Sequence, residues 1–159
     1  EQHGGRNFAN GKQMFTVGTC VACHKFGGQG NEFGPDLAKL DPKAFTSPTD
    51  VLKHVLDPSL KIDDKYTLYT ITLTTDKTLT GMILEEKGGV VKLIENPLAS
   101  TKPLEIKVED IASRRKATTS PMPKGLLDKL TKDEILDLTA YVWSKADPQH
   151  KLFSGHHGH

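Results

Sequence analysis

The chain has 159 residues, enough for one domain or for one domain that carries a sizeable insertion. Hydrophobic residues make up 36% and aromatic residues 6%, so the core is modest, and no apolar run reaches the length of a membrane span. The net charge is +1, and residues 61–116 carry ten basic and nine acidic side chains against eleven of each elsewhere. This even mixture argues against nucleic acid or an anionic membrane as the main partner.

The first predicted element is a helix over Asn7–Val17. Phe8, Gly11, Met14 and Phe15 recur at steps of three and four residues and form one apolar stripe. Glycine lowers helix propensity, so we expect another helix to approach the backbone closely at Gly11.

Residues 20–24 read Cys-Val-Ala-Cys-His and contain the only two cysteines of the chain. The C-x-x-C-H spacing is the attachment signature of c-type haem. Positions i, i+3 and i+4 of a helical turn share one face, so Cys20, Cys23 and His24 can meet the same flat ligand. The two thiols would bond covalently to the porphyrin edge, and the imidazole would take one axial position on the iron.

Three other interpretations of this motif are weaker. A disulfide between Cys20 and Cys23 is possible. A thioredoxin-like redox pair needs a βαβ context, whereas residues 25–34 contain four glycines and predict a loop. A structural zinc site would need a fourth ligand beyond His24, for example from the histidine-rich C-terminal tail.

A second helix is predicted to begin at Pro48, with Ser47 as its N-cap, and to end before Pro58. His54 lies on this helix and is expected to be solvated rather than to bind a metal. The inner face of the helix comprises Val51, Leu52, Val55 and Leu56.

The next segment, residues 61–116, is rich in β-branched residues and threonine. Tyr69, Ile71 and Leu73 share one face at a period of two residues. These features predict a small antiparallel β meander, curled into a partly closed barrel, which needs support from the helical part because four short strands are marginally stable alone. Its four strands are expected at residues 66–75, 78–84, 90–95 and 104–108.

A final helix is predicted to begin at Thr131, where Thr131 and Glu134 have the spacing of a capping box. Asp147-Pro148 is expected to end it. Residues 148–159 are polar and glycine-containing, so we expect a flexible tail. The apolar stripe of this helix comprises Ile135, Leu138, Tyr141 and Val142.

A haem iron with one histidine ligand leaves a second axial position to assign, and methionine there raises the reduction potential. Core packing explains Met14, in the first apolar stripe, and Met82, in the β segment. Met122 lies between Pro121 and Pro123, which stiffen the backbone and disfavour helix. Met122 is therefore the predicted second ligand.

Taken together, the haem motif, the Gly-Pro-Asp-Leu run at residues 34–37, the methionine loop and the last helix resemble class I cytochrome c. More narrowly, the chain is similar to haem-binding cytochrome c domains of planctomycetes and verrucomicrobia, which are often fused to large membrane-associated or PQQ-like dehydrogenases. The narrower resemblance rests on Leu-Asp-Pro-Ser at residues 56–59, a β insertion ending near Ile111, and Ser-Pro-Met-Pro-Lys-Gly-Leu at residues 120–126. The resemblance covers about residues 7–146.

The resemblance implies a mostly α cytochrome c fold with an inserted antiparallel β meander, an α+β arrangement. Residues 1–60 and 117–159 would form the haem lobe, and residues 61–116 the insertion. The first and last helices would cross near Gly11.

The resemblance also implies the roles of the site residues. Cys20 and Cys23 would form the thioethers, His24 would be the proximal ligand and Met122 the distal one. The Pro35 carbonyl would accept a hydrogen bond from the other ring nitrogen of His24 and so fix the imidazole tautomer.

The expected function is single-electron transfer by one covalently attached haem c, without enzymatic chemistry because both axial positions are filled. The expected partners are extracytoplasmic redox proteins, a donor dehydrogenase and an acceptor oxidase or reductase. Covalent haem is normally attached outside the cytoplasm, and the chain begins at Glu1, so we expect a processed protein in the periplasm or an equivalent compartment. The alternative is a haem-based ligand sensor or a peroxidase-like enzyme with a labile sixth site.

Two further features, a basic cluster and the terminal histidines, give only weak indications of function. The basic residues 114–116 precede the methionine loop and would either steer an acidic partner or form a solvated cluster. A Cu(II) or Ni(II) ion could bind at His3, the third residue of the sequence, or at the tail residues His156, His157 and His159. The favoured interpretation is that any such affinity is adventitious.

Overall fold

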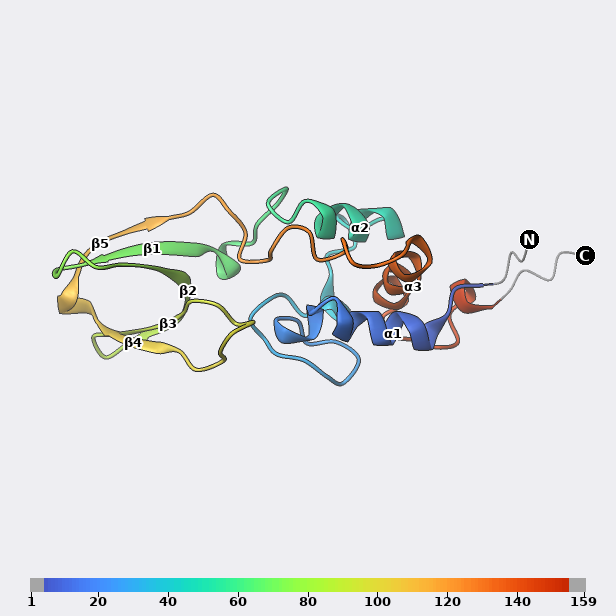
Figure 1. Cartoon of the computed structure of the whole chain (residues 1–159), viewed down its shortest axis with the longest axis horizontal. Helices are drawn as coiled ribbons and strands as arrows, with labels where there is room; N and C mark the ends of the chain where they lie inside the picture. The colour runs from blue at the N-terminus through green and yellow to red at the C-terminus, as the bar shows by residue number, and fades with distance from the viewer. Residues whose placement is uncertain (1–4, 155–159) are drawn as a thin grey trace, which may run out of the picture. The chain divides into compact units, whose positions relative to one another are not determined.

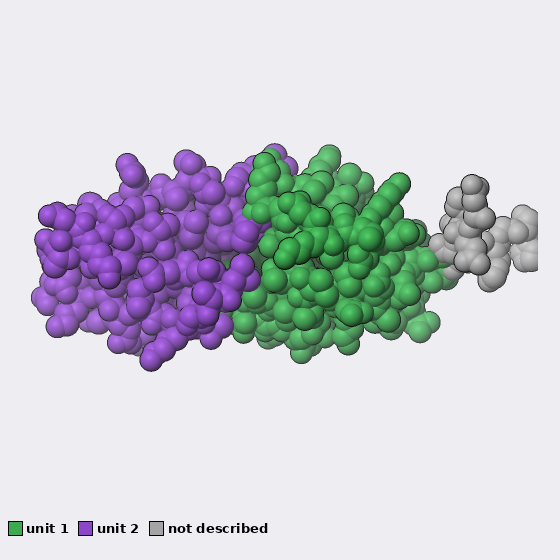
Figure 2. Space-filling view, viewed as in Figure 1, with its two compact units in different colours: residues 1–57, 124–159 green, residues 58–123 purple. Residues whose placement is uncertain are grey.

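The computed structural model describes residues 5–154. The chain forms two compact units (Figure 2): unit 1 comprises residues 1–57 and 124–159, and unit 2 comprises residues 58–123. Unit 1 is helical and unit 2 holds the sheet, which gives an α+β arrangement (Figure 1). Among residues 5–154, no helix has the length and apolar character needed to cross a membrane.

The three predicted helices of unit 1 are confirmed as α1 Phe8–Val17, α2 Pro48–Leu56 and α3 Lys132–Trp143. The predicted capping box also forms: Glu134 accepts a hydrogen bond from the Thr131 N–H at 2.8 Å, and the Thr131 hydroxyl accepts one from the Glu134 N–H at 3.2 Å. Short 3₁₀ turns lie at η1 Cys20–Ala22, η2 Leu37–Lys39 and η5 Lys151–Phe153.

The crossing of α1 and α3 organises the core of unit 1. A Cβ at Gly11 would collide with the Asp137 carbonyl oxygen and lie 2.8 Å from Tyr141 Cβ, so the expected close helix approach at Gly11 is confirmed. The rings of Phe15 and Tyr141 then meet edge to face at 6.0 Å. The buried core of the unit comprises Met14, Phe15, Phe26, Val51, Leu127, Leu138, Tyr141 and Val142.

The predicted end of α3 at Asp147-Pro148 is wrong, because the helix ends at Trp143. Lys145 and Ala146 then take left-handed conformations, with φ of 56° and 57°, which turn the chain away from the helix axis. Neither residue is glycine, so the sequence carried no C-cap signal at this point.

Residues 148–154, part of the expected flexible tail, contact the start of α1. The Leu152 carbonyl accepts a hydrogen bond from the Arg6 N–H at 2.7 Å. Phe153 packs edge to face against Phe8, with ring centroids 5.3 Å apart. The backbone hydrogen bond and the aromatic contact hold an otherwise polar segment against the start of α1. Residues 155–159 lie outside the described part of the chain.

Unit 2 is an antiparallel sheet with strand order β4-β3-β2-β1-β5. The four predicted strands are confirmed, but the prediction missed β5, so the simple meander is wrong. β5 is exposed at every residue except Ile111, and it lacks the alternation that marks a half-buried strand; its pairing with β1 makes it a strand. The strands are β1 Leu68–Leu73, β2 Thr78–Lys87, β3 Val90–Ile94, β4 Leu104–Lys107 and β5 Ile111–Lys116.

The sheet curls because a short connection joins its two edge strands. The 3₁₀ turn η4 Val108–Asp110 links β4 to β5, whereas the edges of a flat five-stranded sheet would lie about 19 Å apart. At this end the Gly89 carbonyl accepts from the Val108 N–H at 2.9 Å, and the Asp110 carbonyl accepts from the Thr74 N–H at 2.8 Å. Figure 1 shows β1 and β5 on one side of the curl and β3 and β4 on the other, which is the expected partly closed barrel.

The inner face of the sheet is apolar along the strands and charged at β5. Tyr69, Ile71 and Leu73 pack on this face as predicted. Arg114 is paired with Ile71 across β1 and β5, and its guanidinium binds Glu86 through two hydrogen bonds of 2.8 and 3.0 Å. Inward-facing charge of this kind protects an edge strand from pairing with another chain.

Two of the three basic residues at positions 114–116 are neutralised within unit 2. Arg114 hydrogen-bonds to Glu86 and lowers the pKa of that carboxyl group, and Lys116 does the same to Asp64 at 2.5 Å. This pairing weakens the case for a basic patch that steers an acidic partner.

Candidate functional site

The Cys-Val-Ala-Cys-His segment forms a single helical turn directly after α1. The Gly18 N–H donates to the Met14 carbonyl at 2.8 Å and ends the helix, and Thr19, at φ of 62°, redirects the chain. The Cys20 carbonyl then accepts from the N–H groups of Cys23 at 3.2 Å and His24 at 2.9 Å. These two hydrogen bonds close the turn that carries the two cysteines and the histidine.

Both cysteines of the chain are free thiols and partly exposed, so they do not form a disulfide with each other. Burial raises the pKa of Cys20 to about 11, and the neighbouring Cys23 adds to the shift. Burial also raises the pKa of Cys23. The pair is therefore protonated at neutral pH, with both sulfur atoms available to form bonds.

The His24 imidazole is held in one tautomer. The side chain is buried, and its Nδ1 lies 2.7 Å from the Pro35 carbonyl oxygen. A carbonyl only accepts, so Nδ1–H donates and Nε2 keeps its lone pair. Burial lowers the pKa of His24, and the Pro35 hydrogen bond opposes this only in part, so the ring is neutral and able to bind a metal through Nε2.

Two glycines let the loop over residues 25–34 close around this turn. A Cβ at Gly34 would lie 2.8 Å from Cε1 and 3.0 Å from Nδ1 of His24, so only glycine lets the backbone lie against the ring. Gly30, at φ of +97°, passes so near the His24 carbonyl that a Cβ would collide with it. The Gly34 N–H also donates to the Cys23 carbonyl at 2.6 Å.

Asn31 completes the closure and is a site residue that sequence reasoning missed. Its backbone N–H donates to the Val21 carbonyl at 3.2 Å, and its side-chain Nδ2 donates to the Ala22 carbonyl at 3.1 Å. One residue thus satisfies two consecutive carbonyls of the turn that carries the cysteines. An asparagine in a glycine-rich loop is typical of a turn, so the sequence alone does not indicate that Asn31 hydrogen-bonds to the cysteine turn.

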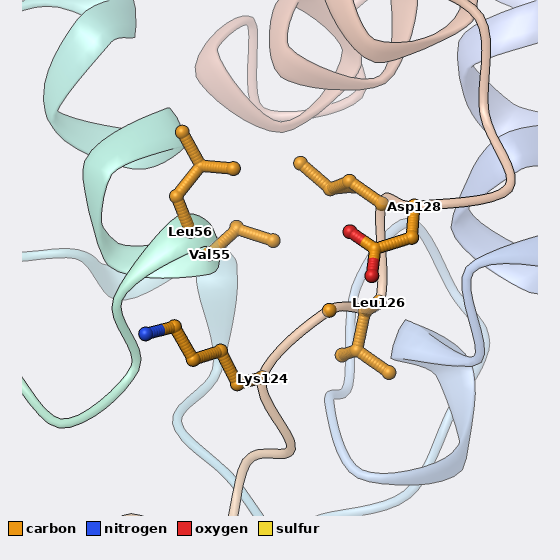
Figure 3. A pocket seen from close by; sticks show the side chains of 7 residues that line it. Val55, Leu56, Lys124, Leu126 and Asp128 are labelled. Atoms are coloured by element: carbon orange, nitrogen blue, oxygen red, sulfur yellow. The ribbon is translucent and has the colours of Figure 1, made fainter.

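A hollow of about 510 Å³ opens in unit 1 between α2 and the loop before α3. Figure 3 shows Val55 and Leu56 on one side and Leu126 and Asp128 on the other. Val55 and the lining residue Leu127 belong to the same apolar cluster that packs Cys20. The hollow and the cysteine turn therefore border one core, and the lining also includes the charged residues Lys124 and Asp128.

These features fit a covalently held porphyrin better than a zinc ion. Within residues 5–154, no three His, Cys, Asp or Glu side chains come together to hold a metal ion. Two free thiols and a buried imidazole with an available Nε2 match the donor chemistry of a covalently held iron porphyrin instead. His3, His156, His157 and His159 lie outside the described residues.

The three methionines lie in different surroundings. Met14 and Met82 are buried, with exposed fractions of 4% and 3%, so the packing role expected for both is confirmed. Met122 is half-buried in the loop that ends unit 2. Its N–H donates to the Ser120 hydroxyl at 3.1 Å, and the Ser120 N–H donates to the Ser59 hydroxyl at 3.1 Å.

His54 was expected to be solvated rather than to bind a metal, and the structure places it at a half-buried position on α2. The side chain is half-buried, with Nδ1 at 2.7 Å from the Asp50 carbonyl of the preceding helical turn. Its ring lies against Phe45, with centroids 4.6 Å apart and the ring planes tilted by 41°. His54 therefore has a packing role in α2.

A comparison with protein families finds that the family model described as Cytochrome c matches residues 8–146. The matched range includes the cysteine turn at residues 20–24, the five strands of unit 2 and the loop that carries Met122. A search of curated proteins finds no match to the chain.

Proposed function

The chain belongs to the cytochrome c family, and from this premise we propose that it is a single-electron carrier with one haem c held by His24 and Met122. Membership of the family implies a covalently bound haem c and electron transfer in general. The proposal adds the number of haems, the two axial ligands and the absence of bond-breaking chemistry.

The observation that carries the proposal is the state of His24. Its Nδ1 is committed to the Pro35 carbonyl and its Nε2 is available, one helical turn from a free thiol. When bound, the haem supplies an iron that alternates between Fe(II) and Fe(III). Cys20 and Cys23 would hold it through thioethers, and Pro35 would keep the imidazole oriented.

Met122 is proposed as the second axial ligand on three grounds. Met14 and Met82 are committed to the cores of their units. Met122 lies in a proline-stiffened loop, two residues ahead of Lys124, which lines the hollow in unit 1. A thioether is a neutral, soft ligand that favours reduced iron and suits an electron carrier.

The proposed setting is the periplasm or an equivalent extracytoplasmic compartment. The proposed partners are a donor dehydrogenase and an acceptor oxidase or reductase, met through small and short-lived interfaces. We also propose that the chain is related to the planctomycete and verrucomicrobial cytochrome c domains, because residues 120–126 resemble the corresponding segment of those domains.

Replacement of Met122 tests the function against its competitor, a ligand sensor or peroxidase-like enzyme with a labile sixth site. We expect the parent ferrous protein to resist carbon monoxide, and Met122→Ala to bind it and to have a lower midpoint potential. Met82→Leu, a swap of similar volume in the core of unit 2, is the matched control and should behave like the parent. A parent protein that binds carbon monoxide readily, with little change in Met122→Ala, would favour the sensor or enzyme.

A further inference from the structure

The loop that carries Met122 has very few polar attachments. Residues 118–123 make only two hydrogen bonds in the described part of the chain, from the Ser120 N–H to Ser59 and from the Met122 N–H to Ser120. Pro121 and Pro123 have no N–H to donate, so the loop has few other means of attachment. Among residues 5–154, the Ser120 hydroxyl is thus the only side-chain group that hydrogen-bonds to the backbone of Met122.

The two serines act in series. Ser59, at the start of unit 2, accepts from the Ser120 backbone at 3.1 Å, and Ser120 then accepts from Met122 at 3.1 Å. Such a turn, in which a serine oxygen bonds the N–H two residues later, fixes local backbone direction. Ser59 and Ser120 are 61 residues apart, so this link closes the two ends of unit 2 on each other next to the methionine.

We propose that Ser120 is a positioning residue that holds Met122 in place for the iron, with Ser59 as its support. This inference rests on the proposed function, because it takes Met122 as the distal ligand. An exogenous ligand reaches the iron only by displacing Met122, and every interaction that orders the loop opposes the displacement. Loss of the Ser120 hydroxyl should therefore make the sixth position easier to reach while leaving the His24 side unchanged.

The expected size follows from the usual contribution of one neutral hydrogen bond. Such a bond contributes a factor of about 2 to 13 to an equilibrium constant. We expect Ser120→Ala to raise the apparent affinity of the ferric holoprotein for imidazole by about three- to tenfold. Ser120→Thr keeps the hydroxyl and should restore the parent value.

The chain offers a matched control in the same unit. Ser100 Oγ accepts from the Lys102 N–H at 3.2 Å, which is the same turn in a loop that carries no proposed ligand. Ser100→Ala should remove a similar hydrogen bond and a similar amount of stability, without changing imidazole affinity. The test is an imidazole titration followed by haem absorbance on parent, Ser120→Ala, Ser120→Thr, Ser100→Ala and Met122→Ala holoproteins.

The possible results distinguish failure of the Ser120 inference from failure of the proposed electron-carrier function. A rise in imidazole affinity for Met122→Ala and Ser120→Ala, but not for Ser100→Ala, supports the positioning role. A rise for Met122→Ala alone overturns it and leaves the electron carrier intact. No rise for Met122→Ala overturns both. Should Ser120→Ala fail to mature, Ser59→Ala removes the supporting link and is read in the same way, with a rise in support and no rise against.

Discussion

The two segments that we propose as iron ligands are held in different ways. His24 is buried in unit 1, and the backbone of Gly34 and the Pro35 carbonyl hold its ring on two sides. Met122 is half-buried at the end of unit 2 and depends on a serine hydroxyl and two flanking prolines. One ligand is fixed by close packing and the other by a short loop, so ligand exchange should take place at the methionine.

The two segments differ in how many contacts each makes with the rest of its own unit. The cysteine turn makes backbone hydrogen bonds to a loop whose glycines allow contact at van der Waals distance, and close packing leaves little room to move. The methionine loop has no regular secondary structure and few hydrogen bonds, which are the features of segments that open at low cost.

The largest expected effect comes from Ile71→Ala in the centre of β1. Ile71 is fully buried, and truncation of such a side chain costs about 2–5 kcal/mol. We expect unit 2 to unfold at a lower temperature and imidazole to bind more easily, while the His24 ligation remains. Thermal melts by far-UV circular dichroism and by haem absorbance measure the two effects. Val90→Ala, at a half-buried position on β3, is the milder control, and loss of His24 ligation before unit 2 unfolds would contradict the comparison.

Gly34→Ala should have the next largest effect, on the histidine side. The added Cβ would meet His24 Cε1 at 2.8 Å, and overpacking of this kind costs about 1–3 kcal/mol. Because the ring must shift away from Pro35, we expect a changed midpoint potential and haem spectrum as well as reduced stability. Gly28→Ala is the control: it has open space around it, and its φ of +79° imposes only a backbone cost. A spectrum that changes equally in both variants would break the argument.

Asn31→Ala should have the smallest effect. It removes one exposed hydrogen bond to the Ala22 carbonyl, worth about 0.5–1.5 kcal/mol, and leaves the backbone bond of Asn31 in place. Asn31→Asp keeps the shape but replaces the donor by an acceptor that faces the carbonyl, so we expect a greater loss. Denaturant unfolding of the holoproteins measures both, with Asn96→Ala in unit 2 as a remote control. If Asn31→Asp and Asn31→Ala had the same free energy of unfolding, this would argue against a hydrogen bond from the Asn31 side chain.

Local patterns in the sequence were sufficient for most of the elements. The stripe around Phe15 predicts α1, the Thr131 and Glu134 pair predicts the start of α3, and the alternation through Ile71 predicts β1 and its inner face. These predictions hold because helix caps and side-chain periodicity are determined within a few residues of chain. The cysteine turn at residues 20–24 is local in the same sense.

Other features depend on partners that are distant in sequence. β5 is a strand because β1 lies beside it, and the chain at Leu152 and Phe153 lies against α1 through its contacts with Arg6 and Phe8. The sequence around each of these residues is polar or charged and carries no periodic signal. Their conformation becomes favourable only when the distant surface is present.

The sequence alone determined which groups the proposed haem site uses: two thiols and an imidazole at the spacing of one helical turn, and a methionine between two prolines. Each of these motifs spans at most five consecutive residues, so it can be recognised without the rest of the chain. Only the tertiary structure decided which ring nitrogen of His24 is available, that Asn31 holds the cysteine turn, and that Ser59 and Ser120 hold the methionine loop. Each of these depends on one donor and one acceptor brought within about 3 Å by folding, and hydrogen bonds of that length have no signature in composition or period.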